Sequence, residues 1–346
     1  MRNKGFHYSM ILNVKTQSND YNITLERGSI NRVGECCDTS KKALIVTDSG
    51  VPYEYAKTVS SQFKKSIIKV IPQGEKSKCF EVFKELLEAL CENDFSRADC
   101  VVAVGGGVVG DLSGFCAATY MRGIDFINIP TTVLSQVDSS IGGKTAIDFM
   151  GYKNIVGAFY PPKAVIIDPD VLKTLSQRQI NNGLAESIKM AATSDKDLFE
   201  YIENNNAYEN IDKVIEGSLK IKKSVVEADE KEQGLRKVLN FGHTAAHAIE
   251  TATGLGDYLH GECVALGMLA FSSPEVRTRL INVLKKYSLP TELDSVGDTV
   301  LEALRHDKKS AGNGVNVVYV NEIGSFEFEL LDFDQLDKVV KEAYLK

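Results

Sequence analysis

The chain has 346 residues, of which 43% are hydrophobic and 25% charged, and its formal net charge is −7. This length predicts about two domains with full cores, and the acidic balance excludes a general surface for nucleic acid or another polyanion. We expect no signal peptide and no membrane span, because no apolar run is long enough. The seven cysteines have no metal-binding spacing, so we expect a cytoplasmic protein with reduced thiols.

The first half alternates short apolar segments with helical ones. A hairpin of two strands is predicted first, at 10–14 and 21–26, and a helix at 78–93 keeps its apolar residues at helical spacing. Buried strands are predicted at 43–47, 66–71, 100–104, 126–129 and 164–167. Strands that alternate with helices favour a parallel sheet, so we predict an α/β domain with a Rossmann-like sheet.

Ligands of such sheets bind at the carboxyl ends of the strands. Asp48 follows the 43–47 strand, where an acid can hold ribose hydroxyls or cap the next helix. Residues 105–111 follow the 100–104 strand and fit G-x-G-x-x-G at the start of a helix. Asp125 starts the next strand instead of ending it. The pattern therefore indicates a dinucleotide site of non-standard topology or a tight turn.

A second polar loop covers residues 138–145 and resembles the end of a P-loop. Its first glycine would fall at Asp138, so that match fails. Lys144 after two glycines still favours contact with an anionic group. Arg122 and the pair at 153–154 add polar groups to the same half, although each alone is typical of a solvated surface.

The second half is mainly helical, and we place a domain boundary near residue 172, giving domains 1–172 and 173–346. Helices are predicted at 177–192, 195–205, 209–229, 242–253, 261–271, 275–287 and 332–345. A late hairpin is predicted from strands at 315–320 and 325–329.

His243 and His247 stand four residues apart, on one face of a predicted helix, and His260 opens the next helix. Three imidazoles near one another suggest a metal, most simply Zn²⁺, although such pairs are also common on helix surfaces. Thr244 stands where a zincin protease has its catalytic glutamate, which argues against that class.

Glu186 lies in an apolar stretch of the 177–192 helix and needs a partner. Lys189 at i+3 or a metal could supply one. With His243 and His260, Glu186 would give three ligands and an open position, as in a catalytic zinc site. Arg236, in the charged segment before the histidine helix, is placed to face that site.

Together these motifs resemble the 3-dehydroquinate synthase family. The segments that carry the resemblance are 74–76, 105–111, 130–132, 138–144, 185–189, 234–236, 240–250, 260–262 and 307–309. The resemblance implies cyclisation of 3-deoxy-D-arabino-heptulosonate 7-phosphate to 3-dehydroquinate with loss of phosphate, in the shikimate pathway of aromatic amino acid biosynthesis. It also implies catalytic NAD⁺, a divalent metal (Zn²⁺ or Co²⁺), a small-molecule substrate and a homodimer.

The resemblance assigns roles residue by residue. Metal ligands are Glu186, His243 and His260, and the proton-transfer residues are His247 and Glu232. NAD⁺-binding residues are Asp48, Gln73, Gly74, Glu75, Lys76, Ser77, Lys78, Gly107, Val108, Val109, Gly110, Asp111, Thr131, Thr132, Lys153, Val171, Leu172, Lys173 and Thr174. Substrate-binding residues are Arg122, Asp138, Lys144, Asn154, Lys189, Lys222, Arg236, Asn240, His247 and one of Lys308 or Lys309.

Some positions depart from the family's pattern. Gln73 replaces an acid, Gly50 replaces an asparagine beside the ribose, and Ala246 replaces a glycine between the two histidines. The stretch after Met268 is also shorter. These changes bear on NAD⁺ affinity and on helix packing.

Three other functions are open. Sister cyclases that make an inosose or a valiolone lack a substrate carboxylate, so Arg236 with Lys222 argues against them. A metal-dependent polyol dehydrogenase would need only a neutral pocket. A non-catalytic zinc protein would not need all the cofactor and anion residues.

Overall fold

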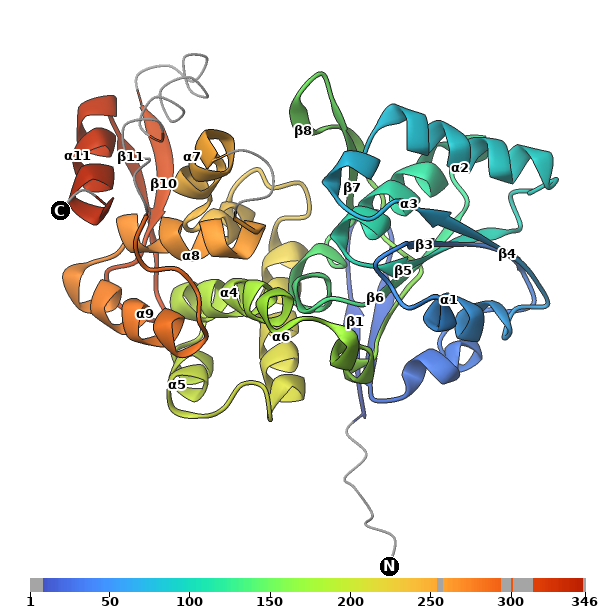
Figure 1. Cartoon of the computed structure of the whole chain (residues 1–346), viewed down its shortest axis with the longest axis horizontal. Helices are drawn as coiled ribbons and strands as arrows, with labels where there is room; N and C mark the ends of the chain where they lie inside the picture. Colours follow the sequence, from blue (N-terminus) through green and yellow to red (C-terminus); the bar gives the residue numbers. More distant parts are fainter. Residues whose placement is uncertain (1–8, 254–257, 294–299, 301–313, 345–346) are drawn as a thin grey trace, which may run out of the picture. The chain divides into compact units, whose positions relative to one another are not determined.

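The computed structural model describes residues 9–253, 258–293, 300 and 314–344, and the chain divides into two compact units (Figure 1). Unit 1 is Met1–Leu175 and unit 2 is Ser176–Lys346. None of the described helices combines the length and apolar character that a membrane span requires. The predicted order of an α/β half followed by a mainly helical half is confirmed.

Unit 1 is built on a seven-stranded sheet of order β1-β2-β9-β6-β5-β3-β4. Its strands are β1 (Ser9–Val14), β2 (Tyr21–Glu26), β3 (Lys42–Asp48), β4 (Lys65–Ile71), β5 (Cys100–Gly105), β6 (Asp125–Pro130) and β9 (Ala164–Ile167). Only β1 runs antiparallel to its neighbour; all the other pairs are parallel. Every strand predicted for this sheet is present.

Both faces of the sheet are buried, which explains the continuous apolar strand sequences. On one face, Leu44 and Val46 pack in a cluster with the apolar residues of α2 (Phe80–Glu92) and α3 (Gly107–Thr119). On the other face, Ala43 and Ile45 pack against α1 (Tyr53–Ser60). Figure 1 shows α1 on the opposite side of the sheet from α2 and α3.

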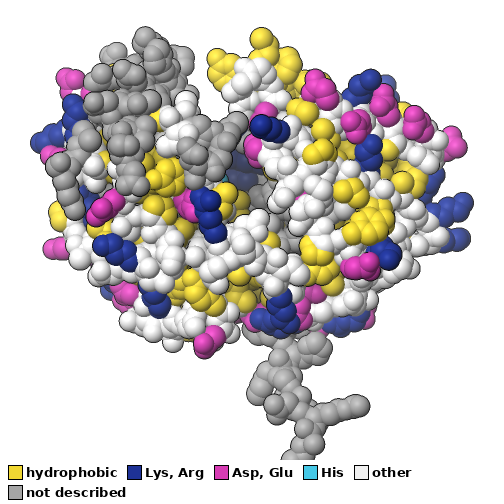
Figure 2. All heavy atoms as spheres, viewed as in Figure 1, with side chains coloured by type: hydrophobic (Ala, Val, Ile, Leu, Met, Phe, Trp, Pro, Cys, Tyr) yellow, Lys and Arg dark blue, Asp and Glu magenta, His cyan; other side chains and the backbone are white. Residues whose placement is uncertain are grey.

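A separate hairpin of β7 (Lys144–Phe149) and β8 (Tyr152–Phe159) was not predicted. Strand β8 is mostly exposed, so it lacks the alternation of buried and exposed residues by which a strand is detected. Apolar side chains gather on this hairpin (Figure 2), and the exposed ones are Phe149, Met150, Tyr152, Ile155 and Phe159. Elsewhere on the displayed face, acidic and basic side chains are interspersed.

Unit 2 surrounds one buried helix, α8 (His260–Ala270), whose residues from Gly261 to Ala270 are all buried. Its other described helices are α4 (Gln177–Ser194), α5 (Lys196–Asn204), α6 (Ile211–Ala228), α7 (His243–Thr253), α9 (Pro274–Lys286) and α11 (Phe333–Tyr344). A hairpin of β10 (Val315–Tyr319) and β11 (Glu327–Leu331) completes the described part. All of these elements were predicted, with ends that differ by a few residues.

Candidate functional site

Two close backbone contacts bring α4, α7 and α8 together. At Gly261 the start of α8 meets α4 so closely that an added Cβ would lie 1.9 Å from the Asn182 carbonyl oxygen. The Gly261 amide also donates to Asn182 Oδ1 at 2.6 Å. At Gly267 an added Cβ would lie 2.0 Å from the carbonyl oxygen of Gly242, just before α7. Only glycine allows both approaches.

The methyl group of Ala246, one of the departures from the family pattern, is accommodated inside this packing. Ala246 is fully buried, and its amide donates to the Gly242 carbonyl at 3.0 Å. The glycine that makes room at this crossing is Gly267 on α8. The substitution at 246 therefore leaves the helix contact intact.

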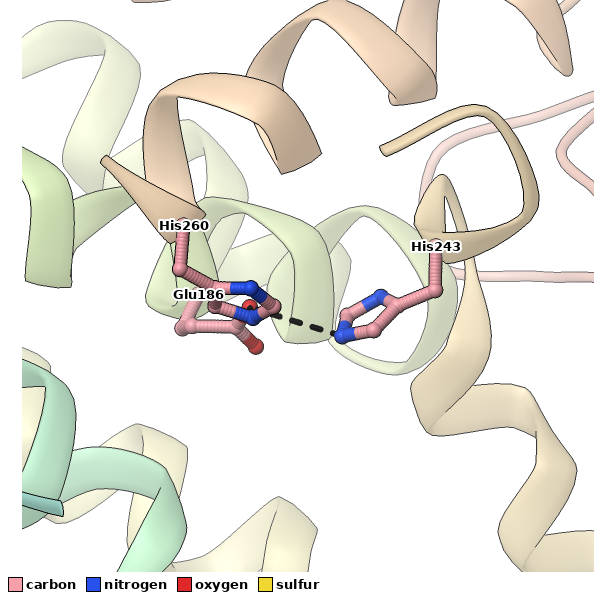
Figure 3. Close-up of side chains that lie close together, drawn as sticks. All are labelled: Glu186, His243 and His260. Carbon is pink, nitrogen blue, oxygen red and sulfur yellow. Dashed lines mark ion pairs between the residues drawn. The ribbon is translucent and has the colours of Figure 1, made fainter. Parts of the chain in front are cut away.

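The packing places Glu186 of α4, His243 of α7 and His260 of α8 around one point (Figure 3). Their ligand atoms lie within 4.8 Å of one another. His260 Nε2 lies 3.5 Å and His243 Nε2 3.9 Å from Glu186 Oε1. Three atoms that share one ion at about 2 Å in tetrahedral geometry lie roughly 3.3 Å apart, so small side-chain rotations bring these donors to a common ion.

Both imidazoles turn Nε2 toward Glu186 because Nδ1 has another partner. His260 Nδ1 lies 2.8 Å from Glu250 Oε1 on α7. His243 Nδ1 lies 3.3 Å from the Phe241 carbonyl oxygen. An acceptor at Nδ1 holds the proton there and leaves the Nε2 lone pair for a metal.

The Glu186 carboxylate supports a cation at this point. It is fully buried, and neither oxygen accepts a hydrogen bond of normal geometry, although Lys189 Nζ forms an ion pair with Oε2. Burial favours the neutral acid, but the Lys189 ammonium and the two imidazoles hold the pKa of Glu186 well below its usual range. An ionised carboxylate with two imidazoles is a ligand set that fits a catalytic zinc.

The two imidazoles differ in basicity. Burial and the nearby Lys189 lower the pKa of His243 to about 3. Burial also acts against protonation of His260, but the nearby carboxylates of Glu186 and Glu250 outweigh it and raise the pKa of His260 to about 9. A cation at this point would have to displace a proton from His260 at neutral pH.

Three predicted substrate cations are buried in unit 2. Lys189 and Arg236 are each 2% exposed and Lys222 is 5% exposed. Ser218 on α6 donates to Ser187 on α4 at 3.0 Å, so the α6 face that carries Ser218 and, one turn later, Lys222 lies against α4. Lys189 is already paired with Glu186, and a group of buried cations in an acidic chain is also suited to an anionic ligand.

A tightly tied loop, residues 229–236, carries two predicted site residues. The Asp229 carboxylate accepts hydrogen bonds from the amides of Gln233, Gly234 and Arg236 at 3.0, 2.7 and 3.0 Å. Burial opposes its ionisation, but these hydrogen bonds lower the pKa of Asp229. The Arg236 guanidinium donates to the Glu230 carbonyl at 2.5 Å. Asp229 was not predicted as part of the site, because only the fold brings the three amides to it.

Asn240 contacts Glu232 of this loop. Asn240 Nδ2 donates to Glu232 Oε1 at 2.8 Å. His247 is exposed, and its ring centroid lies 5.6 Å from that of His243. His247 is not in the metal-ligand group. The predicted substrate residues Lys308 and Lys309 lie outside the described residues.

The glycine loop of unit 1 leads from β5 into α3, which begins at Gly107. Counted from β3, the order of the parallel strands is 2-1-3-4-5, whose switch point lies between β3 and β5. Sheets of this kind bind ligands at the switch point, so the position of the glycine loop is compatible with the predicted nucleotide site. The loop is packed closely: a Cβ at Gly106 would lie 3.2 Å from Thr132 Cγ2, and one at Gly107 3.2 Å from Ser139 Oγ.

Residues at the ends of β3 and β4 face the same edge of the sheet. Asp48 Oδ1 accepts from the amides of Gly50 and Val51 at 2.7 and 3.2 Å, so it ties the turn after β3. The residue that caps α1 is Pro52. In the 73–78 loop, Lys78 is buried and its Nζ contacts Asp111 Oδ2 of α3 at 2.6 Å. This ion pair joins two predicted NAD⁺ segments.

The remaining predicted NAD⁺ residues lie around the same sheet. The Thr131 amide donates to the Gly105 carbonyl at 2.9 Å, and Thr132 Oγ1 lies 2.8 Å from Ser135 Oγ. Val171, Leu172, Lys173 and Thr174 form part of a 3-10 helix that Asp168 caps. Lys153 lies on exposed β8.

The predicted substrate residues of unit 1 come from three segments. Asp138 is in a π-helix, Ser135–Ser139, and Lys144 begins β7. Arg122 and Asn154 have positive φ, at 68° and 56°, and so does Glu232 of unit 2, at 59°. Non-glycine residues rarely adopt this conformation, and it clusters at functional sites.

The chain is similar to 3-dehydroquinate synthases along nearly its whole length. The family models "3-dehydroquinate synthase N-terminal" and "3-dehydroquinate synthase C-terminal" match residues 68–182 and 183–310. The 3-dehydroquinate synthase of Caldanaerobacter subterraneus subsp. tengcongensis is 42% identical over 95% of this chain and 99% of that relative.

Two solved structures show a similar fold at 24% identity. A 2-deoxy-scyllo-inosose synthase complexed with carbaglucose-6-phosphate, NAD⁺ and Co²⁺ has a TM-score of 0.88 and covers 96% of this chain and 100% of its own. A 2-epi-5-epi-valiolone synthase from Streptomyces hygroscopicus subsp. jinggangensis, with NAD⁺ and Zn²⁺ bound, has a TM-score of 0.84 and covers 95% of this chain and 98% of its own.

Proposed function

The chain belongs to the 3-dehydroquinate synthase family, and we propose on that premise that it catalyses the family's reaction. 3-Deoxy-D-arabino-heptulosonate 7-phosphate is converted to 3-dehydroquinate and phosphate. The observation that carries this proposal in the structure is the convergence of Glu186, His243 and His260 in the unit that also buries three cations. An enzyme that catalyses this reaction is classified as a carbon–oxygen lyase.

The metal ligands are Glu186, His243 and His260, and the nucleotide is held by unit 1 through the glycine loop and the ends of β3 and β4. When bound, the cation supplies Lewis acidity toward the carbon-5 hydroxyl, and NAD⁺ supplies a temporary hydride acceptor. Because the product is as oxidised as the substrate, the cofactor is regenerated in each turnover.

The chain's own groups bind the substrate and move its protons. Arg236 offers two parallel N–H donors that match a carboxylate, and Lys189 and Lys222 add positive charge in the same unit. Glu232, held by Asn240, and His247, exposed one turn after a metal ligand, are the proton-transfer groups. The family resemblance also assigns Arg122, Lys144 and Asn154 of unit 1 to the substrate.

The nearest alternatives are the sister cyclases, whose fold is shared. Two features favour the synthase. The match to synthase relatives is much closer in sequence, and the buried Arg236 suits a substrate carboxylate. We also propose that the protein acts in the cytoplasm as a homodimer, which light scattering after size exclusion can test.

The deciding assay measures phosphate release from the heptulosonate phosphate, with and without NAD⁺ and with a chelator. We expect release only when both cofactor and metal are present, without accumulation of NADH. NADH formed in proportion to product would indicate a dehydrogenase instead. Equal turnover of a sugar phosphate that lacks the carboxylate would favour a sister cyclase.

A further inference from the structure

Glu250 on α7 is not one of the three metal-ligand residues, but its side chain contacts one of them. Its carboxylate Oε1 lies 2.8 Å from His260 Nδ1, and its side chain is only 10% exposed. It lies on the same helix as His243 but contacts the ligand on the next helix. The contact therefore joins α7 to α8 at the metal-ligand group.

We propose that Glu250 is a positioning residue that fixes the tautomer and the ring orientation of His260, so that Nε2 is presented as a metal ligand. The inference rests on the proposed metal centre. Its physical basis is that a carboxylate that accepts the Nδ1 proton of a metal-ligating imidazole holds the ring in place and makes Nε2 a better donor.

Other contacts near His260 fix the start of helix α8 and do not orient the imidazole ring. The backbone at His260 is fixed by neighbours: Glu262 accepts from the Leu259 amide at 2.8 Å, and Arg178 binds Glu262 through two contacts of 2.7 Å. These contacts set where α8 begins, and none of them involves the imidazole ring. The ring itself is contacted at Nδ1 by the Glu250 carboxylate.

His243 provides an internal comparison. Its Nδ1 lies 3.3 Å from a backbone carbonyl, a neutral acceptor at a longer distance than the 2.8 Å of the Glu250 contact. Hydrogen bonds to an ionised acceptor are shorter and about twice as strong. The two ligands are thus held unequally, and we expect His260 to depend more on its partner.

The test compares Glu250→Ala and Glu250→Gln with the full-length parent, in Zn²⁺ titrations against a chromophoric chelator. Glu250→Ala should weaken Zn²⁺ binding about 10–100-fold, as for other second partners of metal-ligating histidines. Glu250→Gln keeps a neutral acceptor, so its loss should be smaller. Thr251→Ala is the matched control: Thr251 is exposed on the same helix and donates to the His247 carbonyl, and Zn²⁺ affinity should not change.

A second measurement reads the tautomer itself. ¹⁵N NMR of the imidazoles in the Zn²⁺-loaded protein should show His260 protonated at Nδ1 in the parent and a mixture or loss of that state in Glu250→Ala. Circular dichroism will show whether Glu250→Ala folds. If it does not, the Zn²⁺ affinity of Glu250→Gln and the His260 tautomer of the parent still test the inference. Parental Zn²⁺ affinity in a folded Glu250→Ala, or His260 protonated at Nε2 in the parent, would overturn the inference.

The outcomes also separate this inference from the proposed function. A parent that binds no Zn²⁺, or a Glu186→Ala protein that keeps it, would refute the metal centre itself. A parent that binds Zn²⁺ through Glu186 while Glu250→Ala binds equally well would refute only the role of Glu250.

Discussion

The Gln73 side-chain amide occupies the space that a side chain at position 50 would need. A Cβ added at position 50 would lie 2.2 Å from Gln73 Cδ and 2.3 Å from Nε2. The two residues follow neighbouring strands, β4 and β3, which are paired up to Asp48 and Ile71. Both positions depart from the family pattern, and the contact links them: the glycine at position 50 leaves the space that the Gln73 side chain occupies.

Substitution at this contact should affect NAD⁺ binding in a coupled way. Gly50→Asn should weaken NAD⁺ binding, because the new side chain displaces the Gln73 amide at the edge of the sheet where we place the nucleotide. In a Gln73→Ala background the same change should be tolerated. Calorimetric Kd values for the four proteins would give a coupling of about 0.5–3 kcal/mol.

A matched control is Gly28→Asn, since a Cβ there meets nothing within 4 Å and asparagine tolerates its left-handed backbone. Its NAD⁺ affinity should equal that of the parent. Additive effects of the Gly50 and Gln73 substitutions would contradict the coupling.

Metal content should follow the three-ligand group. Glu186→Ala and His260→Ala should lose stoichiometric zinc, because each removes one of three donors. His247→Ala should keep its zinc and lose turnover, since the ring is not in the ligand group. Elemental analysis of purified proteins checks this, and undiminished zinc in the first two would refute the assignment.

Arg236 should decide substrate preference. Removing one partner of a buried charge pair costs on the order of 3–5 kcal/mol, so Arg236→Ala should lower kcat/KM on the heptulosonate phosphate by roughly two to four powers of ten. Arg236→Lys should recover only part, because an ammonium lacks the paired donors.

The control for Arg236 is a sugar phosphate without the carboxylate, on which the variants should differ little from the parent. Zinc content and NAD⁺ affinity should also stay unchanged. Near-parental kcat/KM of both variants on the keto acid would remove the best local support for the substrate assignment.

Asp229 should act on activity through the loop it ties. Asp229→Ala removes the acceptor of three amides, so Glu232 and Arg236 should lose their fixed positions. We expect kcat/KM to fall by at least about tenfold, or ~1.4 kcal/mol, with zinc content unchanged. Glu227→Ala, which removes a partly buried carboxylate of α6 that pairs with Lys223 at 2.7 Å, should have little effect on kinetics. If Asp229→Ala has the same kcat/KM as the parent, the loop keeps its conformation without the Asp229 carboxylate.

Gly267→Ala should disturb the metal centre from a distance. The new methyl would meet the Gly242 carbonyl oxygen, and relieving such overpacking costs about 1–3 kcal/mol. Because the contact sets the spacing of α7 and α8, zinc affinity should fall together with the melting temperature. Ala265→Gly on the same helix removes a buried methyl group and lowers helix propensity, so it should lower stability by at least about 1 kcal/mol, with zinc affinity preserved. The same zinc affinity in both variants would argue against the packing role.

Much of the fold could be predicted from local patterns. The buried strands of unit 1 are short apolar runs between helical segments, and the helices of unit 2 have helical spacing of apolar residues. The hairpin of β7 and β8 escaped prediction because most of β8 faces solvent and carries no periodic signal. The order of the strands in the sheet could not be predicted either, since strand pairing depends on contacts between segments that are distant in the chain.

The sequence by itself determined the chemistry: the histidines at helical spacing, the glycine loop after a strand, and the family to which these motifs belong. Only the tertiary structure decided which groups support them. Glu250 reaches His260, Asp229 collects three amides, and Gly267 admits Gly242 because packing brings together residues whose positions in the chain give no sign of contact. Ligand identity is a property of residue type and spacing, whereas ligand orientation depends on the distances between helices that only the folded core sets.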